Sequence, residues 1–230
     1  MFAVIFEVQP KQERWDDYLV IAKRLKPSLE AIEGFIDNDR FKSLRDGRRL
    51  LSVSTWADEK ALVRWRVHGG HHAAQERGRF EIFEDYRLRV GEIASDSGLA
   101  ESAFAHQQRF DETKAGGAKW ASVTEIVLSD RAGAAMQSDT AAAASVGLAR
   151  DAAGLVSLEA FASIYTQGKL ALLASWRDEQ AARGWSPVAG PGAKDVRHRR
   201  VRIIRDYGMF DRREAPQFYP DVARPQQGRS

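Results

Sequence analysis

The sequence predicts an α+β fold, in which two ferredoxin-like repeats of order β-α-β-β-α-β pair within one chain as a dimeric α+β barrel. The first observation is an internal repeat: Trp56 and Trp65 recur as Trp176 and Trp185, each 120 positions later. The second is that strand-like and helix-like hydrophobic periods follow this order in both copies. The third is that the helices of such a unit cover one face of its sheet. The other face therefore needs a partner, which a tethered second copy supplies at high effective concentration.

The elements of copy one follow from hydrophobic spacing and from residues that begin or end helices. Gly34 is expected to end the first helix, and Pro27 should kink or break it because proline lacks an N–H. Asp46-Gly47 predicts a turn between two strands, and Asp58 can cap the second helix. We expect strands over 2–9, 35–44, 49–56 and 80–94, and helices over 12–32 and from 58 onward.

Copy two repeats this order but lacks the second half of the second helix. A Pro/Gly-rich loop at 186–192 stands where copy one has the histidine-bearing stretch 68–78, and such a loop cannot continue a helix. We therefore expect copy two to be mainly a structural partner. Its expected strands are 119–128, 155–165, 169–176 and 196–207, and its expected helices are 130–152 and 178–185. The domains are then 1–95 and 119–210, joined by a linker over 96–118 and followed by a tail over 211–230.

Composition excludes several functions. The chain has 230 residues and no cysteine, which rules out disulfides, thiolate nucleophiles and thiolate-bound metal or haem. Its 35 Lys and Arg nearly balance its 32 Asp and Glu, and the arginines of 197–205 are expected on a solvated strand face. No nucleic-acid partner is therefore expected. No apolar run reaches the roughly 18 residues of a membrane helix and no secretory signal is visible, so we expect no membrane partner and a cytoplasmic location.

A distinctive set of motifs stands in copy one at Ala3–Glu7, Ile32–Phe35, Leu50–Trp56, Asp58-Glu59, Trp65–His68, His71, Ala73–Gln75, Gly78 and Asp85–Val90. Copy two has a weaker set at Gly154-Leu155, Trp176–Glu179 and Asp206–Asp211. These stretches resemble the antibiotic-biosynthesis-monooxygenase family. The resemblance implies the paired α+β barrel. Sharing this fold does not determine which of the family's functions the chain has. Three stay open: cofactor-independent oxygenation of a small aromatic or quinol-type substrate, haem binding or degradation, and non-catalytic binding of a small molecule.

The cofactor-independent monooxygenase is our leading expectation. Such an enzyme needs a base to remove a substrate proton, donors that hold the resulting anion, and an apolar pocket that excludes water. We expect this pocket in copy one, between the sheet and the second helix. The catalytic candidates are Trp65, His71, His68 and Glu7, and the substrate-binding candidates are Asn38 and Gln75.

Two of these candidates keep a second interpretation. Trp65 is more typical of a core residue than of a catalytic one, since its repeat partner Trp185 stands in the copy with the truncated helix. Glu7 is a buried carboxylate with a raised pKa if it faces the interior, and an ordinary edge charge if it faces outward.

The three histidines His68, His71 and His72 would share one face of a continuous helix, because they stand at i, i+3 and i+4. Such a set can bind a metal or supply a general base. Exposed histidines on a helix turn softened by Gly69-Gly70 are the commoner case, and we expect no metal site. The distortion at the two glycines decides which ring points into the pocket.

The resemblance also implies what a haem site would need: an Asn on the first strand, a Trp on the second helix, and a His about ten residues after it. These positions hold Glu7, Trp65 and Gln75, so the first and the last depart from the pattern. His71 or His72 could be the ligand one turn earlier, which keeps haem as an alternative to a reaction without a cofactor. A homodimer is also compatible with the sequence.

Overall fold

The computed structural model of the protein describes residues 1–104, 106–129 and 138–224. Copy one contains β1 (Phe2–Pro10), α1 (Trp15–Glu30), β2 (Phe35–Ser43), β3 (Leu50–Trp56), α2 (Glu59–Val67), α3 (Gly69–Arg77) and β4 (Phe83–Asp96). Short helical turns lie at Gln12–Arg14, Gly78–Ile82 and Glu101–Phe104. Copy two contains β5 (Trp120–Leu128), α5 (Asp139–Ala144), β6 (Leu155–Ser163), β7 (Lys169–Trp176), α6 (Glu179–Arg183) and β8 (Ala193–Gly208).

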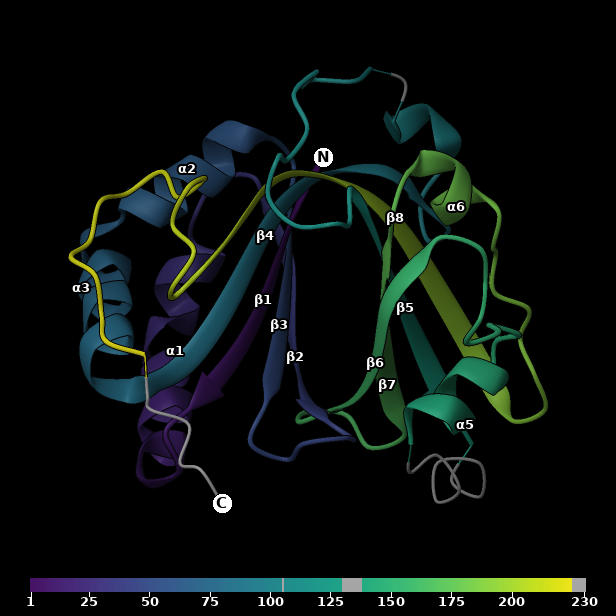
Figure 1. Cartoon of the computed structure of the whole chain (residues 1–230), viewed down its shortest axis with the longest axis horizontal. Coiled ribbons are helices and arrows are strands. Elements are labelled where there is room, and N and C mark those ends of the chain that lie inside the picture. Colours follow the sequence, from purple (N-terminus) through teal and green to yellow (C-terminus); the bar gives the residue numbers. More distant parts are fainter. Residues whose placement is uncertain (105, 130–137, 225–230) are drawn as a thin grey trace.

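The strands of the described chain form one closed barrel in the order β1-β3-β2-β6-β7-β5-β8-β4. The two copies meet at two seams, where β2 pairs with β6 and β4 pairs with β8. Closure leaves no open sheet edge between the copies, because each edge strand finds its hydrogen-bonding partner in the other copy. The helices of the two copies lie outside the barrel on opposite sides (Figure 1). The expected barrel is therefore one continuous sheet, and the two halves are joined at their edges as well as facing each other.

The barrel interior is an apolar core shared by both copies. Ile5 on β1 and Val123 on β5 both point into it and are fully buried. Alternation along a strand sends neighbouring residues to the opposite face. Phe6 accordingly packs with the helix-side cluster of copy one, and Ile126 with the cluster of copy two. The strands β1 and β5 therefore each have two buried faces, one inside the barrel and one under the helices.

The 120-residue repeat reappears as equivalent contacts. Gly34 and Gly154 both have a positive φ, of +86° and +76°. A Cβ at Gly34 would overlap Ala61 of α2, and a Cβ at Gly154 would overlap Ala181 of α6. An aspartate side chain caps the start of each of these helices. Glycine is thus required twice, for backbone conformation and for close approach of the helix.

Two expectations about helices are wrong. The helix α1 continues through Pro27 to Glu30, so the proline does not break it. Pro27 removes one hydrogen bond, while the burial of Leu29 beyond it holds the last turn against the core. In copy two, the described part of 130–152 is helical only at Asp139–Ala144. Gly147 then takes a φ of +70°, which ends the helix. The stretch 130–137 lies outside the described residues.

The segment between the copies and the C-terminal segment pack against each other. Thr113, within the expected linker, is buried and donates to Glu214 Oε2 at 2.7 Å. Glu214 also accepts from the backbone N–H of Lys114 and Ala115. The last described residues then run across α2 and α3 (Figure 1). Within the described residues, no helix combines the length and the apolar character that crossing a membrane requires.

Candidate functional site

A cavity of about 210 Å³ lies in copy one, between the outer face of the barrel and α1, α2 and α3. Its position is the one expected from the sequence. Most of its wall is apolar, and the body of the cavity is lined by Phe6, Leu25, Leu62, Leu88 and Val90. An apolar wall of this kind suits a small, mainly apolar organic molecule better than a polar metabolite.

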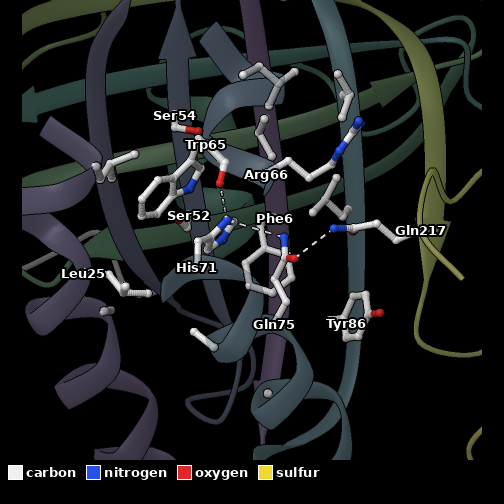
Figure 2. Close-up of a pocket in the computed structure, with 18 of the residues that line it drawn as sticks. Phe6, Leu25, Ser52, Ser54, Trp65, Arg66, His71, Gln75, Tyr86 and Gln217 are labelled. Atoms are coloured by element: carbon white, nitrogen blue, oxygen red, sulfur yellow. Dashed lines mark hydrogen bonds between the residues drawn. The ribbon is translucent and has the colours of Figure 1, made fainter. Parts of the chain in front are cut away.

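Trp65 and His71 form the most specific feature of the cavity wall. Their rings stack with centroids 4.2 Å apart and planes 14° apart. His71 Nδ1 lies 2.9 Å from the backbone carbonyl oxygen of Trp65 (Figure 2). A carbonyl can only accept a hydrogen bond, so Nδ1 carries the proton of the neutral ring. The Nε2 nitrogen of His71 therefore keeps the lone pair that a base needs.

The protonation of His71 is set by its surroundings. Burial lowers its pKa to about 4 and outweighs the opposing effect of the Trp65 carbonyl. The nearby His68 and His72 act in the same direction as burial. The imidazole is therefore neutral throughout the neutral pH range and can accept a proton there.

The histidines do not share one helical face. The α-helix ends at Val67, and His68 has a ψ of 126°, so a new helix starts at Gly69. The break falls one residue before the two glycines. His68 stacks beside Trp65 at 5.5 Å but does not line the cavity, and His72 is exposed and stacks on Tyr219. Among the described residues, no group of three or more His, Cys, Asp or Glu is placed to hold a metal ion.

Asn38 and Gln75 both line the cavity. The amide nitrogen of Asn38 donates to Ser52 Oγ and to the Val53 carbonyl, each at 3.0 Å, which leaves its oxygen to accept from a ligand. Gln75 accepts from Gln217 Nε2 at 3.1 Å and lies beside His71 (Figure 2). Gln75 thus connects α3 to the C-terminal tail.

Glu7 does not lie beside Trp65 and His71, and that expectation is wrong. It points into the barrel, where Arg89 donates to Glu7 Oε2 at 2.6 Å and Arg49 to Oε1 at 3.1 Å. Burial raises the pKa of Glu7, but the adjacent guanidinium groups more than offset it and hold the pKa below its usual value. Glu7 is therefore an ionised partner in a buried ion pair and not a base with a raised pKa.

The sequence did not anticipate that copy two and the tail complete this cavity. Arg205 and Tyr207 of β8 line it, because β8 pairs with β4 across the seam. The tail adds Arg212, Pro216, Gln217 and Tyr219, and α2 adds Arg66. The only local signals were the arginine next to Trp65 and the Arg-, Gln- and Tyr-containing tail. Copy two is therefore more than the structural partner that we expected, because it also supplies residues to the cavity wall.

The arginine-rich part of the cavity surrounds Tyr207. Arg212 donates to Tyr86 Oη and to the Gln217 carbonyl, both at 2.8 Å, and its guanidinium lies 5.5 Å from the centre of the Tyr207 ring. Burial raises the pKa of Tyr207 to about 12, with Arg212 and two further arginines opposing that rise. Tyr207 is therefore a neutral phenol that can donate a hydrogen bond.

The equivalent space in copy two is packed with side chains. Trp185 stacks on Trp176 at 6.0 Å and meets His198 edge to face at 5.1 Å. A second hollow lies elsewhere, beside α5, and Arg45 and Asp139 in its wall are already paired with each other. Trp65 therefore lines a cavity in copy one, whereas its repeat partner Trp185 packs in the core of copy two.

Comparison with known proteins gives a consistent set of similarities. Residues 1–77 match the family described as antibiotic biosynthesis monooxygenase. The chain is 42% identical over 229 residues to the protein named "Jasmonate monooxygenase ABM" from Pyricularia oryzae, and this match covers 97% of the chain and 100% of the relative. It is 34% identical over 92 residues to YqjZ of Bacillus subtilis, covering 40% of the chain and 78% of that protein.

Solved structures share the fold at low sequence identity. A crystal structure of aldoxime dehydratase aligns with a TM-score of 0.55, 11% identity, and coverage of 88% of this chain and 79% of that chain. At this identity the likeness concerns the fold alone.

Proposed function

The chain belongs to the antibiotic biosynthesis monooxygenase family, and from this premise we propose that it is a monooxygenase acting on a small, mainly apolar molecule held in the cavity of copy one. The observation that carries the proposal is the stacked pair of Trp65 and His71 in the wall of an apolar cavity. The imidazole there is neutral at neutral pH and has a free lone pair that can accept a proton from a substrate.

We propose that the reaction uses no tightly bound cofactor and that an anthrone- or quinol-type substrate is the simplest class for it. His71 Nε2 takes a proton, and the resulting aromatic anion transfers electrons to O₂. In an anthrone, CH₂ becomes C=O and the second oxygen atom leaves as water. The substrate supplies all the electrons that reduce O₂, so no external reductant is needed. The cavity wall keeps bulk water from quenching the anion.

Jasmonate is the second substrate to test. The Pyricularia oryzae relative carries this substrate in its name, and the similarity extends over nearly the whole chain. The cavity includes residues from β8 and the tail, which lie within this long match and outside the shorter match to the family.

Haem is the alternative, and the side chains fit it poorly. His71 covers one face of Trp65 at a ring distance of 4.2 Å, which leaves no space for a porphyrin between them. The amide of Gln75 is held by Gln217, and Glu7 is turned into the barrel. Neither Glu7 nor Gln75 is therefore placed as the haem pattern requires.

The test is oxygen uptake by the purified protein with an anthrone-type substrate or with jasmonate, with ¹⁸O₂ labelling of the product. With the anthrone-type substrate we expect one labelled oxygen atom in the product and uptake that does not depend on added haem, flavin, metal or reductant. The jasmonate assay also contains a two-electron reductant, because hydroxylation of a C–H bond needs two electrons that jasmonate does not supply. Absorbance in the Soret region after addition of haem tests the alternative. Turnover that requires haem would overturn the cofactor-free mechanism, and no turnover of any substrate would favour a binding protein.

A further inference from the structure

Three arginines from three different parts of the chain line the copy-one cavity. Arg66 comes from α2, Arg205 from β8 and Arg212 from the tail. All three act on Tyr207 through their charge, so they lie around the same phenol. Figure 2 shows Arg66 extending away from the Trp65 and His71 rings, toward the side where Gln217 enters.

These arginines have no carboxylate partner among the residues that the structure describes. Arg212 bonds only to a phenol and a carbonyl, and neither Arg66 nor Arg205 forms an ion pair in this part of the chain. Glu59 is the acidic residue in the cavity wall, and Arg109 already binds it at 2.7 and 2.8 Å.

The barrel interior of the same protein shows the contrasting arrangement. Arg89 and Arg199 are fully buried there, and each is paired with a glutamate, Glu7 or Glu125. A guanidinium withdrawn from water is unfavourable unless an anion compensates it. The cavity arginines are half-buried and have no carboxylate within ion-pair distance among the described residues, so they are able to bind an anion that enters the cavity.

We propose that the substrate of this site carries a carboxylate, and that Arg66, Arg205 and Arg212 bind it while the apolar body extends toward Trp65 and His71. Guanidinium groups suit a carboxylate because their N–H donors match its two oxygens. This inference rests on the proposed function for the location of the reacting end. It adds that the substrate is an organic acid held at the end opposite to the base.

The experiment compares acids with their neutral esters. Dissociation constants are measured by calorimetry for jasmonate and for naphthoate, each beside its methyl ester, near neutral pH. We expect the wild-type protein to bind an acid at least about tenfold more tightly than its ester. The variants Arg66→Gln and Arg205→Gln should weaken acid binding by about ten- to a hundredfold, because each loses a hydrogen bond to a charged group, and should change ester binding little.

The matched control is Arg64→Gln, on the same helix but exposed and bound to the Glu33 carbonyl; it should leave acid binding unchanged. Circular dichroism checks that every variant is folded. Equal affinity for acid and ester, no binding of either acid, or acid binding unaffected by both arginine variants would overturn the proposal. Acid binding through the arginines without oxygen uptake would leave it standing and contradict the proposed function. Oxygen uptake with no preference for the acid would do the reverse.

Discussion

The imidazole of His71 lies flat against the indole of Trp65, and its Nδ1 is bonded to the backbone carbonyl of the same tryptophan. The two contacts fix both the tilt and the tautomer of the ring. A histidine held in this way has its second nitrogen available in one direction only, which is the arrangement expected of a positioned base.

Replacing His71 by Ala should lower kcat/KM with an anthrone-type substrate by roughly 10²–10⁴-fold, the usual contribution of a general base. His68→Ala is the matched control, since His68 stacks on Trp65 but does not line the cavity, and it should have a much smaller effect. In the wild type, the rate should be level around neutral pH and fall as the pH drops toward about 4, where His71 takes a proton. Equal loss in both variants would remove His71 from the role of base.

The stability of the protein should fall as the pH is lowered from about 6.5 to 5. His71 and His198 both have a pKa lowered to about 4, with burial as the largest cause. Between pH 6.5 and 4 the unfolded chain binds protons that the native chain does not, so acid favours unfolding. We expect about 1–2 kcal/mol from each histidine between pH 7 and 5. Urea unfolding at the two pH values measures it.

The control for this pH effect is the double variant His71→Gln, His198→Gln, which should lose most of the dependence between pH 6.5 and 5. Buried carboxylates whose pKa is lowered, such as Glu7, act in a separate window. Their contribution is present above the unfolded pKa of about 4.5 and is lost as the pH falls below it. A double variant with the same slope as the wild type would refute the assignment.

Glu7→Gln should destabilise the protein by about 3–5 kcal/mol, because Arg89 is then a buried charge without its partner. Arg89 also donates to Ser175 of copy two at 2.9 Å, so part of this loss falls on the joint between the copies. Urea unfolding measures the change, with the exposed Glu33→Gln as control. A variant of unchanged stability but without activity would return Glu7 to the list of catalytic residues.

Ending the chain after Ala215 should raise the KM for the substrate by about tenfold or more. This removes Pro216, Gln217 and Tyr219 from the cavity wall and keeps Glu214 in contact with Thr113. The loss of wall exposes the substrate to water and frees Gln75. A chain ending after Arg224 is the control and should behave as the wild type. Equal KM values for the two truncated proteins would show that the tail takes no part in binding.

Local patterns in the sequence were sufficient for the repeat and for most of the elements. Hydrophobic alternation, Gly34 and Asp58 each act within a few residues, so they can be read without knowing what packs around them. The cavity in copy one, and Trp65 and His71 in its wall, followed from the same reasoning, because α2 must turn its apolar face to the sheet.

The tertiary structure decided the remaining features of the site, because these features depend on contacts between residues far apart in the chain. Alternation places Glu7 opposite Phe6, but only the position of the helices decides that Phe6 faces the cavity and Glu7 faces Arg89 in the barrel. Pairing of β8 with β4 brings Arg205 of copy two into the site of copy one. The packing of α3 and the tail brings Gln217 to Gln75, separated by 142 positions. Short-range periodicity in the sequence cannot predict such pairings. They follow from closure of the barrel and from the helices and the tail that cover its outer face.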